Sequence, residues 1–331
     1  MSLWPFENPD DERIERLRER YAKALNADFL RTEMARASAC GDLDPIDVTV
    51  ANARPLGIKK DRFIVLVDAE SAEGRLELVA KGYCDERARH VIENHRLLWN
   101  AGLGDLSAPV RTSRPWGVLE ALGVTLTERL PGEHPRPSNA ASAERAGHAA
   151  AFLHSRRAPL EPRFGLEAAL DNVERHARSL EKHEPGLARG AVRLAERARS
   201  FCDDFEDPPA DPLNGDLSLG SFLLDGDKTY LLDWDIACRF DRAWDVAYYL
   251  VQLRRFGLEQ DVDTGTVRER FLTAYLAASG TDGRFARSVA YHEALVCVHK
   301  AYTARRLQGP AWPRVVHELL RLADARLTEL E

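Results

Sequence analysis

The sequence is poor in cysteine, and its few cysteines form no recognisable pattern. There are 5 cysteines in 331 residues, an odd number, and none belongs to a Cys-x-x-Cys pair. They are scattered along the chain as Cys40, Cys84, Cys202, Cys238 and Cys297. Disulfide frameworks and structural zinc sites depend on paired or closely spaced cysteines, so the sequence predicts neither.

Two kinds of membrane or targeting segment are also missing. The chain contains no run of about 18 apolar residues, which is roughly the length needed to cross a bilayer. It begins Met-Ser-Leu-Trp-Pro-Phe, without a basic region or a long apolar core, and so does not resemble a secretory signal. We therefore expect a cytoplasmic protein that has no membrane partner.

Clustered positive charge is absent as well. The formal net charge is -7 and no long basic run occurs. Because neutralising nucleic-acid phosphates requires clustered Lys and Arg, no nucleic-acid partner is predicted. The phosphate-binding pattern G-x-x-x-x-G-K-[ST] is missing, and Gly102-Leu103-Gly104 lacks the third glycine of a dinucleotide fingerprint. The first absence disfavours a P-loop enzyme, and the second rules out a dinucleotide fingerprint at residues 102–104.

The most informative stretch runs from residue 213 to residue 250 and reads LNGDLSLGSFLLDGDKTYLLDWDIACRFDRAWDVAYYL. Asp216 precedes two short apolar runs, and Asp233 follows them. Asp225-Gly226 separates the runs, and Asp-Gly between short apolar runs is a strong signal for a β-hairpin. A hairpin folds the chain back on itself, so we expect the carboxylates of Asp216 and Asp233 to lie close together at one end of it.

Two neighbouring carboxylates at a hairpin edge suit phosphoryl transfer. Magnesium prefers oxygen ligands and usually takes one or two protein carboxylates beside the phosphates of its substrate. In kinases one Asp orients the attacking hydroxyl group, and a second Asp with a nearby amide or hydroxyl holds the metal. The protein-kinase pattern H-R-D-x-x-x-x-N places the metal-binding amide five positions after the base, where this chain has Ser221 after Asp216.

At three places this stretch resembles the aminoglycoside phosphotransferase family, relatives of the choline and protein kinases. Residues 214–223, NGDLSLGSFL, are similar to the catalytic loop H-G-D-x-x-x-x-N-x-L. The segments LDWD and DRAWDVA that follow are similar to the family's I-D-W-[DE] and G-D-P-x-W-D-L-A segments. By this resemblance Asp216 is the catalytic base and Asp233 binds magnesium. Asp245 would begin a helix and hold the backbone of the catalytic loop by hydrogen bonds.

Two positions depart from the family's pattern. Asn214 replaces the usual His, and Ser221 replaces the usual Asn. A hydroxyl group on a shorter side chain suits a hard cation less well than an amide oxygen does. We therefore expect Ser221 to be a weak second metal ligand, or one that acts through a water molecule. These departures motivate an alternative, a kinase-fold binding protein (a pseudokinase) that has lost efficient catalysis.

A further resemblance places a lysine on a strand. Leu-Val-Ala-Lys, which ends at Lys81, is similar to the V-A-I-K strand of kinases, whose lysine contacts the α- and β-phosphates. Kinases pair this lysine with a glutamate on the next helix, which we predict over residues 85–100. Glu93 is our choice, and Glu86 on the same helical face is the alternative. The structural alternative for Lys81 is a strand lysine that points to solvent.

The segment Glu-Arg-Leu-Pro-Gly-Glu at residues 128–133 is similar to the one that joins the two lobes in this family. There the backbone presents N–H and C=O groups to the edge of adenine. The resemblance therefore implies that Glu128 and Leu130 bind the nucleotide. The alternative is a Pro-Gly linker without a function.

Patterning along the rest of the chain completes the prediction of the fold. Residues 10–37 have apolar side chains at helical spacing, residues 46–129 are rich in strand formers, and helical patterns dominate beyond residue 137. We predict an α+β, two-lobed protein-kinase-like fold with a small antiparallel-sheet N-lobe and a mostly helical C-lobe. The expected parts are a helical extension over 1–44, a nucleotide-binding lobe over 45–130, and a helical lobe with the catalytic loop and substrate site over 131–331.

Other polar and aromatic residues of the helical half carry no motif. We expect His154, His292 and His299 to be core histidines, and Trp312, between two prolines, to mark a loop. The predicted function is ATP-dependent and magnesium-dependent transfer of a γ-phosphate to a small-molecule hydroxyl group. The acceptor would be an aminoglycoside-like antibiotic, a sugar or an amino alcohol. A non-enzymatic acidic scaffold is a third possibility, and no pattern indicates an oligomeric state.

Overall fold

The structure is a computed structural model of the chain. It describes residues 10–45, 48–59, 61–71, 74–161, 165–205, 210–280 and 283–331. The start of the predicted N-terminal extension lies outside the described residues. The chain forms two compact units, an N-lobe that ends at Pro131 and a C-lobe that begins at Gly132.

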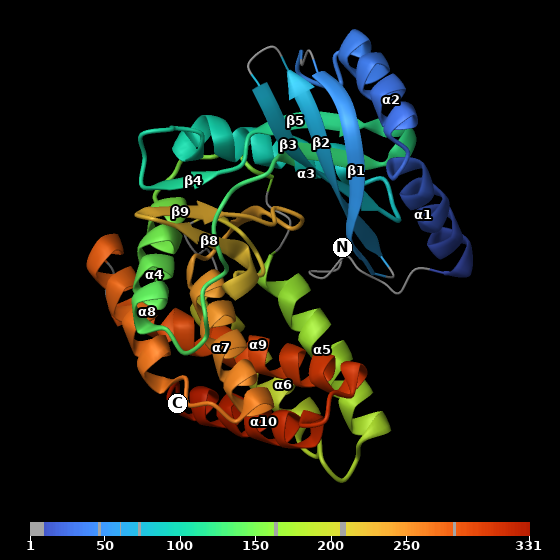
Figure 1. Cartoon of the computed structure of the whole chain (residues 1–331). Coiled ribbons are helices and arrows are strands. Elements are labelled where there is room, and N and C mark those ends of the chain that lie inside the picture. The colour runs from blue at the N-terminus through green and yellow to red at the C-terminus, as the bar shows by residue number, and fades with distance from the viewer. Residues whose placement is uncertain are drawn as a thin grey trace. The chain divides into compact units, whose positions relative to one another are not determined.

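A five-stranded antiparallel sheet forms the frame of the N-lobe (Figure 1). Its strand order is β1-β2-β3-β6-β5. The strands of this sheet are β1 Val48–Ile58, β2 Arg62–Ser71, β3 Gly74–Tyr83, β5 Pro115–Leu119 and β6 Val124–Glu128. The N-lobe also contains the short strand β4 Val110–Thr112, which the sequence patterns did not predict.

Two helices, α1 Asp11–Ala24 and α2 Ala27–Cys40, pack on this sheet. The single helix predicted over residues 10–37 is therefore wrong. The break occurs at Asn26, whose side chain accepts a hydrogen bond from the N–H of Phe29 at 3.0 Å and so caps a second helix.

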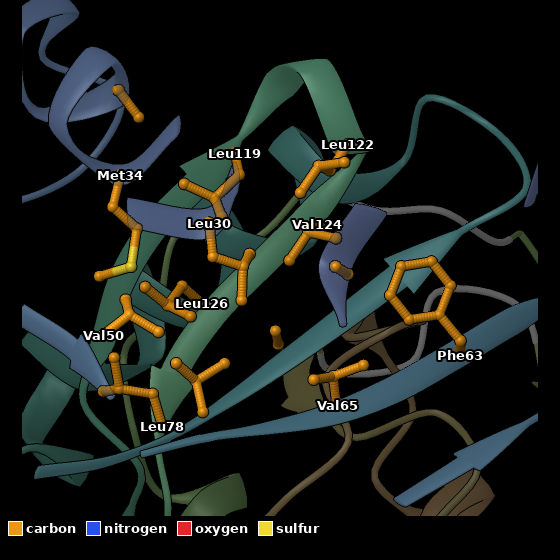
Figure 2. Close-up of a cluster of buried hydrophobic side chains, with 14 of the residues drawn as sticks. Leu30, Met34, Val50, Phe63, Val65, Leu78, Leu119, Leu122, Val124 and Leu126 are labelled. Atoms are coloured by element: carbon orange, nitrogen blue, oxygen red, sulfur yellow. The ribbon is translucent and has the colours of Figure 1, made fainter. Parts of the chain in front are cut away.

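The hydrophobic core of the N-lobe lies between these helices and the sheet (Figure 2). Leu30 and Met34 of α2 gather with Val50, Leu78 and Leu126 from three different strands. All five side chains are buried. Burying a large apolar side chain stabilises a fold by about 1.5–3 kcal/mol, so α2 is an integral part of this core.

Helix α3 Ala88–Leu98 packs against β5 and β6. The predicted helix over residues 85–100 began too early, because Asp85 and Glu86 lie in a bend before α3. A π-helical turn, Trp99–Leu103, follows α3 and contains Gly102 at φ 112°. Glu86 is therefore not on the same helix as Glu93, and the alternative that relied on a shared helical face is wrong.

The C-lobe is built mainly of helices, which pack in pairs: α4 with α8, α9 with α10, and α7 and α5 with α9 (Figure 1). These helices are α4 Ala140–His154, α5 Leu166–His183, α6 Ala191–Ser200, α7 Ala243–Gln260, α8 Gly265–Ser279, α9 Gly283–Leu307 and α10 Trp312–Thr328. Trp312 begins α10, with Pro313 in its first turn, so the loop predicted there is wrong. Proline is well tolerated at that position because the first N–H groups of a helix have no partner within it.

Four short strands of the C-lobe lie in or beside the motif-bearing segment, residues 213–250, which contains Asp216, Asp233 and Asp245. They are β7 Asp211–Leu213, β8 Phe222–Asp225, β9 Lys228–Leu231 and β10 Cys238–Phe240. β8 and β9 form the predicted antiparallel hairpin, which turns at Gly226 with φ 53°. With a small antiparallel sheet in one unit and mostly helices in the other, the predicted α+β class is confirmed. Among the described residues, no helix combines the length and apolarity that a membrane span requires.

Candidate active site

Pairing between β7 and β10 closes the motif-bearing segment at its base. Leu213 lies opposite Cys238, so the loop that leaves β7 starts beside the chain that enters β10. Gly215, at φ 92°, passes so close to this returning chain that a Cβ atom would stand 2.7 Å from the carbonyl oxygen of Ile236. Only glycine satisfies both requirements. The loop that carries Asp216 is therefore packed directly against the segment that carries Asp233.

Asp245, in the first turn of α7, holds the backbone of this loop. Its carboxylate is fully buried and accepts hydrogen bonds from the N–H groups of Asn214 at 2.7 Å and Gly215 at 2.8 Å. The role that the resemblance implied for Asp245 is confirmed. Hydrogen bonds to a buried carboxylate are among the stronger ones in proteins, about 1.5–3 kcal/mol each, so this contact fixes the loop on a rigid helix.

Two further residues support the same anchor. Trp244 donates from Nε1 to the carbonyl oxygen of Gly215 at 2.9 Å. His154 of α4 was expected to be a core histidine and is indeed buried, but its ring also has a specific function. Nε2 lies 3.3 Å from Oδ2 of Asp245, and Nδ1 lies 2.8 Å from the hydroxyl of Tyr275. Sequence reasoning missed these contacts, because no local pattern connects residues this far apart.

Asn214 joins the two acidic segments. Its side-chain amide donates to the carbonyl oxygens of Leu232 at 3.0 Å and Asp233 at 2.9 Å. Asp233 itself has φ 63°, a conformation that is uncommon for a residue other than glycine. Such backbone strain is characteristic of functional positions. A buried amide that replaces the family's usual His therefore fixes the backbone that presents Asp233.

Ser221 lies in a helical turn, Leu219–Ser221, at the start of β8. Its hydroxyl is buried, accepts from the N–H of Ser218 at 3.1 Å and donates to Oδ1 of Asn214 at 3.4 Å. The two positions that depart from the family's pattern are thus in contact with each other. Since two hydrogen bonds already engage this hydroxyl, the metal-binding role of Ser221 stays a prediction.

In the N-lobe, Lys81 lies on β3 between Ile64 of β2 and Thr125 of β6, and its ammonium group is 5.7 Å from the centre of the Tyr83 ring. Glu93 is exposed on α3, and its side chain takes part in no hydrogen bond or ion pair among the described residues. The structure therefore does not bring together the predicted pair Lys81–Glu93. The nucleotide-binding role of each residue remains a prediction.

Glu128 and Leu130 lie at the end of the N-lobe. The N–H of Glu128 donates to the carbonyl oxygen of Arg114 at 2.9 Å, and the Glu128 carboxylate accepts from the N–H of Arg114 at 3.1 Å. Leu130 is buried. These contacts hold the segment in one extended conformation, and its predicted contact with adenine stays a prediction.

The other predicted core histidines also lie in the C-lobe interior. Nε2 of His292 is 3.2 Å from Oδ2 of Asp241, and Nδ1 of His299 is 3.4 Å from Nδ1 of His176. Burial holds the pKa of His299 well below its usual value, with a further contribution from the nearby charge of Lys300. Within the described ranges, no group of three or more His, Cys, Asp or Glu side chains is arranged to hold a metal ion.

Solved structures with a similar fold are small-molecule kinases by name. A choline/ethanolamine kinase family protein from Mesorhizobium loti has a TM-score of 0.58 and 18% sequence identity, covering 91% of this chain and 94% of its own. A putative fructosamine-3-kinase from Thermobifida fusca has a TM-score of 0.57 and 21% identity, covering 88% and 97%. A spectinomycin phosphotransferase in complex with ADP and spectinomycin has a TM-score of 0.58 and 12% identity, covering 89% and 98%.

These likenesses confirm the predicted kinase-like fold. A search of curated protein sequences finds no match to this chain. The sequence model of the Phosphotransferase enzyme family, in contrast, matches residues 64–289, which is more than half of the chain and includes the anchored loop. The chain therefore belongs to the Phosphotransferase enzyme family.

Proposed function

We propose that this protein transfers the γ-phosphoryl group of ATP to a hydroxyl group of a small molecule. The observation that carries the proposal is the anchoring of the Asp216 loop. Asp245 holds its backbone from a helix, and Asn214 ties it to the segment of Asp233. Phosphoryl transfer depends almost entirely on positioning and charge, and this arrangement supplies both.

In this proposal Asp216 accepts the proton of the attacking hydroxyl group. Asp216 is half-buried and lies in the loop directly after Gly215. Lys81, together with the backbone at Glu128 and Leu130, would bind the nucleotide, and the exposed Glu93 would act only if it moved to pair with Lys81. Support for a nucleotide comes from the family and from the spectinomycin phosphotransferase, whose structure contains ADP.

A magnesium ion fits the residues present in the C-lobe. Magnesium typically takes only one or two protein oxygens beside substrate phosphates, so a small set of protein ligands is enough. Asp233 would supply a carboxylate, and Ser221 would contribute through a water molecule because its hydroxyl is already engaged by Ser218 and Asn214. When bound, the ion would neutralise charge on the transferring phosphoryl group.

The variant Asp216→Asn tests the proposal. Removing a positioned general base costs about 10²- to 10⁴-fold in turnover, while ATP binding should persist. Turnover is measured with an acceptor panel of aminoglycosides, sugars and amino alcohols, and ATP binding by calorimetry. Asp227→Asn, in the exposed turn of the hairpin, is the matched control and should retain wild-type turnover.

Unchanged turnover in Asp216→Asn would remove this residue from the mechanism. Tight ATP binding without turnover on any acceptor would instead favour the alternative of a binding protein that has kept the fold.

A further inference from the structure

An arginine-rich groove lies between α6 and α10, which pack against each other in the C-lobe (Figure 1). Its volume is about 400 Å³, a size that suits a small molecule. None of the residues 213–250 lines it, so it is separate from the candidate active site. Among its lining side chains, four arginines face a single carboxylate: Arg189, Arg193, Arg197 and Arg321 against Asp324. This positive excess contrasts with the formal net charge of -7 of the whole chain.

Helical spacing brings these charges to the groove. Arg193 and Arg197 are one turn of α6 apart, about 6 Å along the helix, and Arg189 precedes Arg193 by the same interval. Arg321 and Asp324 are three residues apart and therefore belong to one face of α10. Each helix thus turns a charged face toward the same groove.

Two of the four arginines already have carboxylate partners. Arg197 forms ion pairs with Asp324 and, at 2.7 Å, with Glu331. Arg321 donates from Nε to the carboxylate of Glu318 at 3.2 Å. These two guanidinium groups need no ligand to balance their charge.

The other two arginines lack such partners. Arg189 and Arg193 are exposed, and neither side chain takes part in a hydrogen bond or an ion pair within the described ranges. The carboxylate of Glu181 accepts from the N–H groups of Gly190 and Val192, at 2.8 and 3.1 Å, at the start of α6. Two positive charges on the groove are therefore left for a ligand to neutralise.

The groove also has apolar walls. Leu187, Leu194 and Leu320 line it, and Leu194 and Leu320 are buried except for the small part of each that faces the groove. A ligand that fits would direct an anionic group to Arg189 and Arg193 and lay a less polar body against the leucines.

We propose that this groove binds a small-molecule phosphate monoester. A phosphate monoester carries a charge of about -1.5 to -2 at pH 7 and three acceptor oxygens, which matches two uncompensated guanidinium groups. The planar fork of arginine pairs with phosphate through two parallel hydrogen bonds. The inference goes beyond the proposed function, because no residue of the proposed phosphotransferase mechanism lines the groove.

Three probes test the class of ligand. Phenyl phosphate combines a phosphate monoester with an apolar body, benzenesulfonate has a similar shape but one negative charge, and inorganic phosphate lacks the body. Binding to the full-length protein is measured by ligand-detected NMR at about pH 7.5, where the monoester is mostly a dianion. Low ionic strength is used because salt screens exposed charges, and nucleotides are left out because their phosphates would compete. We expect phenyl phosphate to bind about tenfold more tightly than benzenesulfonate, and several-fold more tightly than inorganic phosphate.

Variants assign the binding to the groove. Arg189→Gln and Arg193→Gln each remove one uncompensated charge and should weaken phenyl phosphate binding by about tenfold. Arg193→Lys keeps the charge but loses the fork, so it should recover only part of the affinity. Arg270→Gln removes an exposed arginine of α8 that does not line the groove, and it should bind like the wild type. Thermal melting verifies that each variant is folded.

Several outcomes would overturn the inference. Benzenesulfonate that binds as tightly as phenyl phosphate would show that the groove does not select a dianion. Affinity that is unchanged in Arg189→Gln and Arg193→Gln, or that falls equally in Arg270→Gln, would place the probe elsewhere. Absence of phenyl phosphate binding together with a dimer that dissociates in Arg193→Gln would show that a second copy of the chain occupies the groove. Since no turnover is measured, the result is independent of the proposed phosphotransferase activity.

Discussion

The variant Asp245→Asn tests how much the hydrogen bonds from Asp245 contribute to holding the catalytic loop. The Asp245 carboxylate uses one oxygen for the N–H of Gly215 and the other for the N–H of Asn214 and the His154 ring. An asparagine keeps one acceptor oxygen and turns an NH₂ group toward the remaining partner. Whichever way the amide is oriented, one buried backbone N–H loses its acceptor.

An unsatisfied buried donor costs about 1–3 kcal/mol, so we expect Asp245→Asn to lower the free energy of unfolding by about 2 kcal/mol. Asp245→Ala leaves both N–H groups without an acceptor and should lower the free energy of unfolding by about twice as much. The loop should also be placed less accurately, and a misplacement of about 1 Å can lower turnover by about 10²-fold. Urea denaturation gives the stability, and steady-state kinetics with ATP and a sugar acceptor give the turnover.

Asp241→Asn is the matched control. Asp241 is another buried carboxylate at the start of α7, and it accepts from the N–H of Ala243 at 2.8 Å rather than from the catalytic loop. It should lose stability but keep turnover within a few-fold of the wild type. Equal losses of turnover in Asp241→Asn and Asp245→Asn would refute the reasoning, because the loop would then not depend specifically on Asp245.

Three other predictions follow from the same structure. Asp233→Ala should abolish magnesium-dependent nucleotide binding, and equal ATP affinity of the wild type with and without magnesium in calorimetry would contradict this. Ser221→Asn should lower the magnesium concentration needed for half-maximal activity, since an amide oxygen reaches further than a hydroxyl. Identical magnesium titration curves for the wild type and the variant would show that residue 221 does not bind the metal. Burial lowers the pKa of His95 to about 3, so the folded state keeps this ring neutral while the unfolded chain binds a proton below about pH 6.5. The contribution of His95 to the free energy of unfolding should therefore fall by about 1.4 kcal/mol per pH unit as the pH decreases from about 6.5 towards 3. Urea denaturation at a series of pH values measures this dependence, and the variant His95→Gln should lack the contribution.

The sequence predicted the local parts of the candidate site well. Asp-Gly between two short apolar runs predicted the β8–β9 hairpin, and the structure confirms it. The resemblance to the family implied the anchoring role of Asp245, because its position in the DRAWDVA segment matches that of the family's residue. The hairpin depends on residues that are close together in the chain, whereas the anchor joins residues 30 and 31 positions apart and was predicted from the resemblance alone.

Contacts between distant segments were beyond sequence reasoning. His154 and Asp245 are 91 residues apart, and His292 and Asp241 are 51 residues apart. Periodicity shows that a helix has a buried side, but not which neighbour covers it. The predicted pair Lys81–Glu93 failed to form for the same reason, since the rotation of α3 about its axis leaves Glu93 exposed.

Helix boundaries were the other weak point. Asn26 lies within a stretch of continuous helical periodicity, and its effect depends on a side-chain cap rather than on hydrophobic spacing. Pro313 suggested a loop around Trp312, although proline is equally at home in the first turn of a helix. In both cases one side chain was compatible with two local structures, and the hydrophobic pattern could not distinguish them.

Detection of the reaction product is the most direct test of the central claim. The wild-type protein is incubated with ATP, magnesium and a panel of aminoglycosides, sugars and amino alcohols, and mass spectrometry follows ADP and phosphorylated acceptor together. We predict that a phosphorylated acceptor accumulates in equal amount to ADP, and that Asp216→Asn lowers both by about 10²- to 10⁴-fold. ADP release without a phosphorylated acceptor, or product formation that Asp216→Asn leaves unchanged, would contradict the account.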